Sequence, residues 1–160
     1  MAEYEIRALS AEDRRRVRAI LTERWTSPRI VNHGRIYRAD ELPGFVAVQH
    51  GEIWGLLPYA IEAGQCEVVS LDSLAEGQGI GMALLAAVEE PARAAGCRRV
   101  WLITTNDNLH ALGFYQRRGL VLVEVRRGAL DVSRKLKPSI PLVGMNGIPL
   151  RDEIELEKTL

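Results

Sequence analysis

The sequence has only two cysteines, no long apolar run and no excess of charge of either sign. Cys66 and Cys97 have neither CxxC nor Cys–His spacing, so we expect reduced packing residues in a cytoplasmic protein and no metal site. No apolar stretch reaches the roughly 18 residues that span a bilayer, and the first residues lack a secretory signal pattern. Lys plus Arg equals Asp plus Glu at 21 each, which gives no electrostatic case for a nucleic-acid or membrane partner.

What is present is ordinary for a globular protein. The 160 residues, 47% hydrophobic and 26% charged, predict a single domain over 1–160. Apolar periodicity and turn residues predict strands over 4–9, 45–49, 52–61, 66–74, 99–104, 121–125 and 153–158, and helices over 10–24, 79–95, 108–117 and 129–135. Segment 25–43 has no clear period, so we expect a loop with a short helix. This order predicts a mixed α/β sheet flanked by helices, with an antiparallel meander in its first half.

A glycine-rich loop, E-G-Q-G-I-G at 76–81, joins the apolar run 66–74 to an amphipathic stretch. A strand that passes through alternating glycines into a helix makes an anion site, because the first N–H groups of the helix are unpaired and no Cβ blocks approach. The spacing fits neither the G-x-G-x-x-G dinucleotide loop nor the G-K-[ST] ending of a P-loop.

A second motif, N-D-N-L-H-A-L-G-F-Y-Q-R-R-G-L at 106–120, predicts a helix that carries Tyr115 and is closed by Gly119. Together, and in this order, the two motifs resemble the GNAT superfamily of N-acetyltransferases. The family loop R/Q-x-x-G-x-G/A is matched at 76–81, except that Glu76 stands where Arg or Gln is usual. The family pattern N-x-x-A-x-x-F-Y-x-x-x-G-F is matched by Asn108, Ala111, Phe114, Tyr115 and Gly119, with Leu120 in place of the last Phe.

This resemblance implies an enzyme that moves an acetyl group from acetyl-CoA directly to a primary amine in a ternary complex, without a metal. It implies a strand that splays from its neighbour before the loop, leaving a cleft for the pantetheine arm. Asn108 would bond the pantetheine or thioester end, and Tyr115 would be the general acid for the CoA thiolate. The cofactor-binding residues it implies are Leu71, Asp72, Ser73, Leu74, Gly77, Gln78, Gly79, Ile80, Gly81, Met82, Asn108 and Tyr115. The cofactor core would cover about 66–125, and 126–160 would hold a connection and the last strand.

The general base is less defined. Family analogy favours Glu67, whereas Asp72, on the opposite face of a regular strand, and a water chain are alternatives. The acceptor is a small-molecule amine or a protein or peptide amine, and we expect segments 25–43, 104–106 and 126–150 to recognise it. Segment 126–150 either walls the acceptor pocket or forms a homodimer contact.

A second hypothesis is a catalytically silent acyl-CoA-binding or regulatory module. Glu76 favours it, because an anion near phosphates weakens CoA binding, and so does the undefined base. Tyr115 argues against it.

Overall fold

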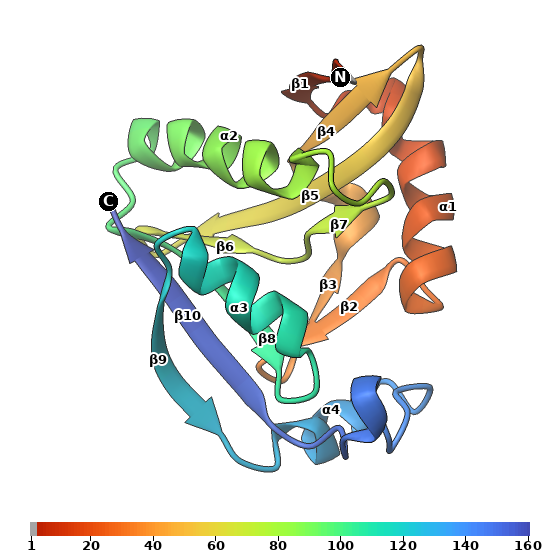
Figure 1. Cartoon of the computed structure of the whole chain (residues 1–160), viewed down its shortest axis with the longest axis vertical. Coiled ribbons are helices and arrows are strands. Elements are labelled where there is room, and N and C mark those ends of the chain that lie inside the picture. The colour runs from red at the N-terminus through yellow and green to blue at the C-terminus, as the bar shows by residue number, and fades with distance from the viewer. Residues whose placement is uncertain (1–2) are drawn as a thin grey trace.

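The computed structural model describes residues 3–160, so residues 1–2 of the predicted domain lie outside it. One sheet dominates the fold (Figure 1). Its spatial order is β1 (Glu5–Ala8), β4 (Gly44–Gln49), β5 (Glu52–Glu62), β6 (Gln65–Val68), β8 (Arg99–Thr105), β10 (Glu153–Thr159) and β9 (Val121–Arg126), with β7 (Asp72–Ser73) paired to β5. Neighbours run antiparallel except for the parallel pair β6–β8. The predicted mixed, mostly antiparallel sheet is confirmed.

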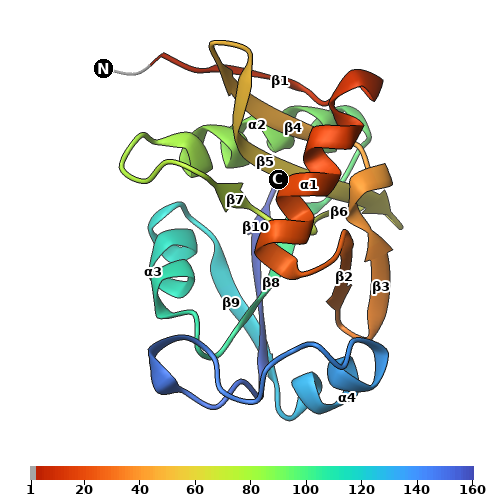
Figure 2. The same cartoon turned by 90° about the vertical axis from the view of Figure 1, so that its right-hand side faces the viewer.

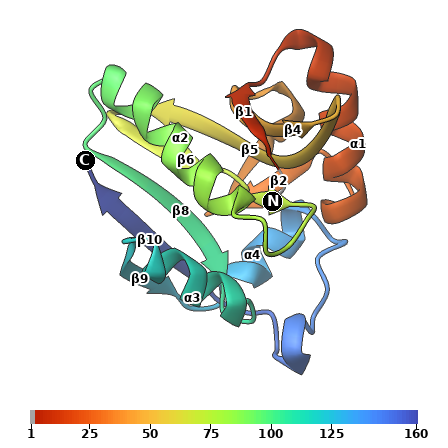
Figure 3. The ribbon, with the colours of Figure 1, turned by 45° about the horizontal axis from the view of Figure 1, so that its top comes forward.

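Helices cover both faces of this sheet. Figure 2 shows α1 (Arg14–Trp25) and the hairpin of β2 (Arg29–Asn32) and β3 (Arg35–Arg38) on one side, with α2 (Ile80–Ala94) and α3 (Leu109–Arg117) on the other. In Figure 3, α2 lies over the β4–β5 half and α3 beside β9. The short helix α4 (Ala129–Leu136) contacts β2. Within residues 3–160, no helix is long and apolar enough to cross a membrane.

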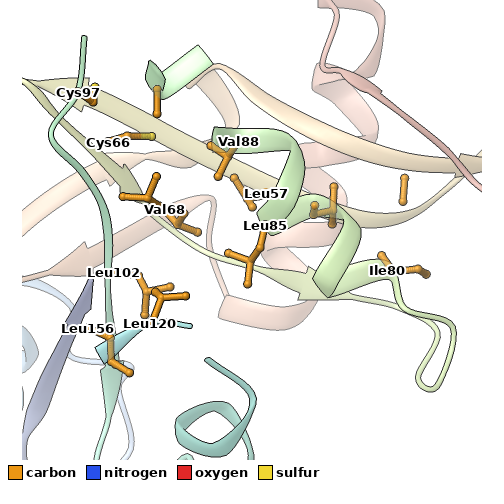
Figure 4. Packing of buried hydrophobic residues seen from close by; sticks show 14 residues of the cluster. Leu57, Cys66, Val68, Ile80, Leu85, Val88, Cys97, Leu102, Leu120 and Leu156 are labelled. Atoms are coloured by element: carbon orange, nitrogen blue, oxygen red, sulfur yellow. The ribbon is translucent and has the colours of Figure 1, made fainter. Parts of the chain in front are cut away.

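The larger apolar core lies between α2 and the sheet. Ile80, Leu84, Leu85 and Val88 are buried at helical spacing, as their periodicity predicts. Close packing requires Gly55 on β5, because a Cβ there would lie 3.0 Å from Leu84 Cδ1 and closer still to the Ile80 side chain. Figure 4 shows this core, whose labelled members outside α2 are Leu57, Cys66, Val68, Cys97, Leu102, Leu120 and Leu156.

The prediction that segment 25–43 is a loop with a short helix is wrong for most of the segment. The segment forms the β2–β3 hairpin, and its only helical turn is the 3₁₀ turn η2 (Ala39–Glu41). His33 and Gly34 occupy a two-residue turn with φ of 43° and 75°, the backbone that a type I′ hairpin needs. The signal was present in the sequence: a His-Gly pair flanked by the β-branched and aromatic residues of 30–31 and 36–37.

Candidate active site

The sheet opens between β6 and β8. Their parallel pairing ends at Val68 opposite Leu102, while β8 continues to Thr105 and is held on its other side by β10. The predicted strand over 66–74 breaks at this point, because one residue more lies between Val68 and Asp72 than between their partners on β5. This bulge turns the chain away from β8, so β7 pairs with β5 alone.

The glycine-rich loop follows directly after β7. Gly77 and Gly79 have φ of 71° and 74°, which a side chain would strain, and Gly79 is the N-cap of α2. The first backbone bond of the helix runs from Ala83 N–H to the Gly79 carbonyl, which leaves the N–H groups of residues 80–82 without helical partners. Residues 76–79 are exposed, so an anion can reach these N–H groups and the positive end of the helix.

A pocket of about 720 Å³ lies at the sheet opening. The bulge, the end of β8, the hairpin strand β2 and the start of α3 each supply part of its wall. Much of the remaining wall comes from residues 137–150, which follow α4 and which we call the strap, and the end of α1, Leu130 and Glu153 complete it. All three segments expected to recognise the acceptor therefore meet at one pocket, and segment 126–150 walls it through the strap.

Tyr115 lies on α3 and lines this pocket. Its hydroxyl has no hydrogen-bond partner among residues 3–160. Burial raises the pKa of the phenol, and the nearby Asp72 carboxylate raises it further. The hydroxyl therefore keeps its proton at neutral pH and is free to donate it to a bound group. Asn108, also in the pocket wall, is the N-cap of α3, and its Oδ1 accepts from Ala111 N–H at 3.1 Å.

Asp72 ties helix α1 to the bulge. Its Oδ1 accepts from Arg24 Nε and Trp25 Nε1, each at 3.1 Å, and Ser70 Oγ donates to Oδ2 at 3.2 Å. Burial raises the pKa of this carboxyl, and these donors oppose the shift. Both oxygens accept hydrogen bonds, so Asp72 joins the end of α1 to the bulge.

Glu67 lies beneath the pocket rather than in its wall. Its Oε1 accepts from the Tyr37 hydroxyl and lies 3.0 Å from His33 Nε2, and Asn32 Nδ2 is 3.4 Å from Oε2. Burial and the bond to Glu67 raise the pKa of Tyr37. Of these residues only Asn32 reaches the pocket, where its Nδ2 also donates to the Val69 carbonyl at 3.1 Å.

The strap is fixed to the rest of the pocket by polar anchors. The buried Asp107 carboxylate accepts from Thr105 Oγ1 at 2.5 Å and from Met145 N–H at 2.8 Å. Asn106 Nδ2 donates to the Pro149 carbonyl at 2.9 Å. At the other end Lys137 Nζ donates to the backbone carbonyls of Trp25, at the end of α1, and Arg29, at the start of β2, and burial lowers the pKa of this lysine.

Three groups of residues escaped sequence reasoning: the His33–Tyr37 partners of Glu67, the Asp107 anchor, and Glu153, a third carboxylate in the pocket wall. The cysteines lie outside that wall. Burial raises the pKa of the Cys66 thiol to about 12, so it is not a ready nucleophile. Across the described part of the chain, no three His, Cys, Asp or Glu side chains are grouped to hold a metal ion.

Known proteins resemble this chain in sequence or in fold. Residues 5–120 match the model of the acetyltransferase (GNAT) family. Protein YdhI of Bacillus subtilis strain 168 is 49% identical over 85% of this chain and 86% of its own. Among solved structures, an IAA acetyltransferase from Bacillus cereus has a TM-score of 0.75 at 20% identity, over 99% of this chain and all of its own. A GNAT acetyltransferase from Elizabethkingia anophelis with acetyl-CoA bound has a TM-score of 0.73 at 19% identity, over the whole of both chains. The two structures share the fold, and the family match over most of the sequence establishes that the chain belongs to the acetyltransferase (GNAT) family.

Proposed function

We propose that the protein transfers the acetyl group of acetyl-CoA directly to a primary amine at the opening between β6 and β8. The observation that carries this proposal is the continuity of three features. The exposed start of α2, whose N–H groups can bind an anion, lies next to the gap between the splayed strands, because a Cβ on Gly81 would lie 3.7 Å from Leu71 Cδ2. Leu71 in turn lines the pocket that contains the free hydroxyl of Tyr115.

The residues present fit acetyl-CoA. Residues 77–82 would hold the pyrophosphate through backbone N–H groups, since glycine at 77 and 79 leaves room for close approach. Residues 71–74 border the opening on its β7 side and would bond the pantetheine arm through their backbone. Glu76 is exposed, so its carboxylate can stay in solvent where salt screens it. We therefore expect it to weaken CoA binding without abolishing it.

The cosubstrate supplies an activated thioester, and the residues of the chain position the reactants and transfer protons. Tyr115 would hydrogen-bond the sulfur and pass its proton to it as the C–S bond breaks. Burial raises the pKa of this phenol, which keeps it protonated at neutral pH but makes it a weaker acid toward the thiolate. Because the cysteines lie away from the pocket wall, we propose attack by the amine itself, with no acyl-enzyme.

Glu67 remains the base suggested by family analogy. The donors from Tyr37, His33 and Asn32 occupy its oxygens, so it could receive the amine proton only through water or after one donor moves. We therefore propose that the amine proton passes through water to Glu67, which also holds the hairpin tip against the pocket.

We propose a small amine with an apolar body as the acceptor, and a protein or peptide amine as the alternative. The strap closes one side of the pocket, and its apolar members Ile140, Pro141, Val143 and Leu150 face the space. A cytoplasmic setting, where acetyl-CoA and reduced thiols are available, fits this proposal.

The test is release of free CoA from acetyl-CoA in the presence of a panel of primary amines. Tyr115→Phe should lower kcat by about 100-fold, the usual size of a general-acid contribution. Tyr59→Phe is the matched control, because Tyr59 packs on Phe45 outside the pocket and should keep full activity. Binding of acetyl-CoA without turnover of any amine would instead favour the silent binding module.

A further inference from the structure

Three carboxylates line the pocket: Asp72, Asp107 and Glu153. In the first two, hydrogen bonds from the surrounding chain engage both oxygens. Glu153 differs. Its Oε2 accepts from the His33 backbone N–H at 2.9 Å, whereas its Oε1 has no hydrogen-bond partner in residues 3–160.

The free oxygen is not a surface oxygen. Glu153 is only 2% exposed and Oε1 has almost no solvent contact, so a ligand in the pocket reaches this oxygen when the Glu153 side chain turns toward the pocket. A buried carboxylate oxygen without a partner is costly, so native structures seldom keep one unless a ligand, an ion or water completes it. The pairing of β10 with β8 places Glu153 at the end of β8, opposite Thr105.

The cationic side chains in or next to the pocket wall have partners other than Glu153. Arg24 is bonded to Asp72, and the Lys137 ammonium is bonded to backbone carbonyls. Arg126 lies opposite Glu153 on β9, but its guanidinium pairs with Glu155 and Glu124. No ion pair within 4.0 Å joins Arg126 to Glu153. One Arg126 nitrogen is itself buried and unpaired, so this arginine is the competing partner that an experiment must separate.

The rest of the wall is largely apolar. Its apolar members include Ile30 and Val31 of the hairpin, Leu130 of α4, and Ile140 and Leu150. A ligand that fits both the unpaired Glu153 oxygen and the apolar wall has a primary ammonium group and an apolar body. An ammonium donates to carboxylates in short, charge-assisted bonds.

We infer that Glu153 Oε1 binds the ammonium group of the acceptor and that this residue sets the preference for a cationic amine. The inference rests on the proposed function and deepens it, since it assigns the acceptor side of the same site. Glu153 is a substrate-binding residue in this account. The bound ammonium gives up one proton through water to Glu67 before the nitrogen attacks, and the proton that the sulfur receives comes from Tyr115.

The first test compares steady-state kinetics of wild type, Glu153→Gln and Glu157→Gln, with 2-phenylethylamine and n-hexylamine as acceptors. Glutamine keeps an oxygen for the His33 N–H and removes the charge. We expect Glu153→Gln to raise the amine KM by about 10- to 100-fold, with kcat within about threefold and the acetyl-CoA KM unchanged. Glu157 lies on the same strand but outside the pocket wall and pairs with Arg99, so Glu157→Gln should leave the amine KM unchanged.

Two results would overturn the inference while leaving the proposed function intact. An unchanged amine KM, with a lower Tm, would make Glu153 a structural partner of Arg126. A lower kcat at unchanged KM would make it a proton-transfer group. If wild type acetylates neither amine, the proposed function itself fails for these acceptors, and the inference fails with it.

A second measurement needs no turnover and no stable variant. Calorimetry of wild type with CoA present should show 2-phenylethylamine binding at least about tenfold more tightly than 2-phenylethanol, its neutral analogue. Equal affinities for the two compounds would contradict the inference.

Discussion

Replacing Gly144 by alanine tests how the strap is held over the pocket. A Cβ at this position would lie 2.6 Å from Asp107 Cγ and 3.1 Å from Asp107 Cβ, and nearer still to Oδ2. Separations below 3.0 Å are essentially never seen for a real Cβ, so the carboxylate has to move. Its movement breaks the 2.8 Å bond from Met145 N–H, which fixes the strap at its middle.

The size of the effect follows from that bond. A hydrogen bond to a charged group contributes about 1.5–3 kcal/mol, and about 1.4 kcal/mol corresponds to a factor of ten. We therefore expect the strap of Gly144→Ala to open about 10- to 100-fold more often. The acceptor KM should rise as a result. The affinity for acetyl-CoA should stay the same, because the glycine loop leads into α2 and lies outside the pocket wall that the strap forms.

Hydrogen exchange read by mass spectrometry on peptides covering 140–150 measures this opening directly. Exchange at the Met145 amide should accelerate by that factor in Gly144→Ala. Leu142→Ala is the control, since Leu142 is in the same strap but is 73% exposed, and its exchange should match wild type. Unchanged protection of Met145 in Gly144→Ala would refute the account of the anchor.

Two further predictions concern charge. Glu76→Gln should tighten acetyl-CoA binding severalfold at low salt and have less effect at 0.5 M salt, because salt screens the charge of the exposed Glu76. Calorimetry at the two salt concentrations measures this. Equal affinities of wild type and Glu76→Gln at low salt would contradict the prediction. The Arg7 guanidinium and Ser10 hold the pKa of Asp13 below its ordinary 3.8, so its carboxylate stabilises the fold above that pH and the contribution is lost as pH falls below it. The urea midpoint of unfolding should therefore fall more on Asp13→Asn substitution at pH 7 than at pH 3. An equal fall at both pH values would contradict this prediction.

Local motifs could be predicted from the sequence, because their chemistry lies within a few consecutive residues. The glycine loop at 76–81 and the Tyr115 helix are of this kind, and both lie where the motifs placed them. The β2–β3 hairpin was equally local. Its His33-Gly34 turn repeats the signal that correctly predicted the turn at His50-Gly51, but the prolines around it obscured the short strands.

The acceptor side could not be predicted, because it depends on contacts between distant segments. The His33 N–H reaches Glu153 across 120 residues, and Glu67 meets Tyr37 across 30. No periodicity encodes such pairs. The strap presents the same difficulty: its composition left a pocket wall and a dimer contact equally open, and the side chain of Asp107, on another segment, fixes it over the pocket.

The most direct test of the central claim, acetyl-CoA bound at the start of α2, is calorimetry with wild type, Gly79→Asp and Gly96→Asp. Both glycines have φ of 74° and lie at opposite ends of α2, so the two substitutions impose the same backbone strain. At position 79 the new carboxylate would occupy the free N–H groups and repel phosphate. The account predicts micromolar binding to wild type and Gly96→Asp, and binding at least about tenfold weaker to Gly79→Asp. Equal binding to all three folded proteins, or none to wild type, would contradict it.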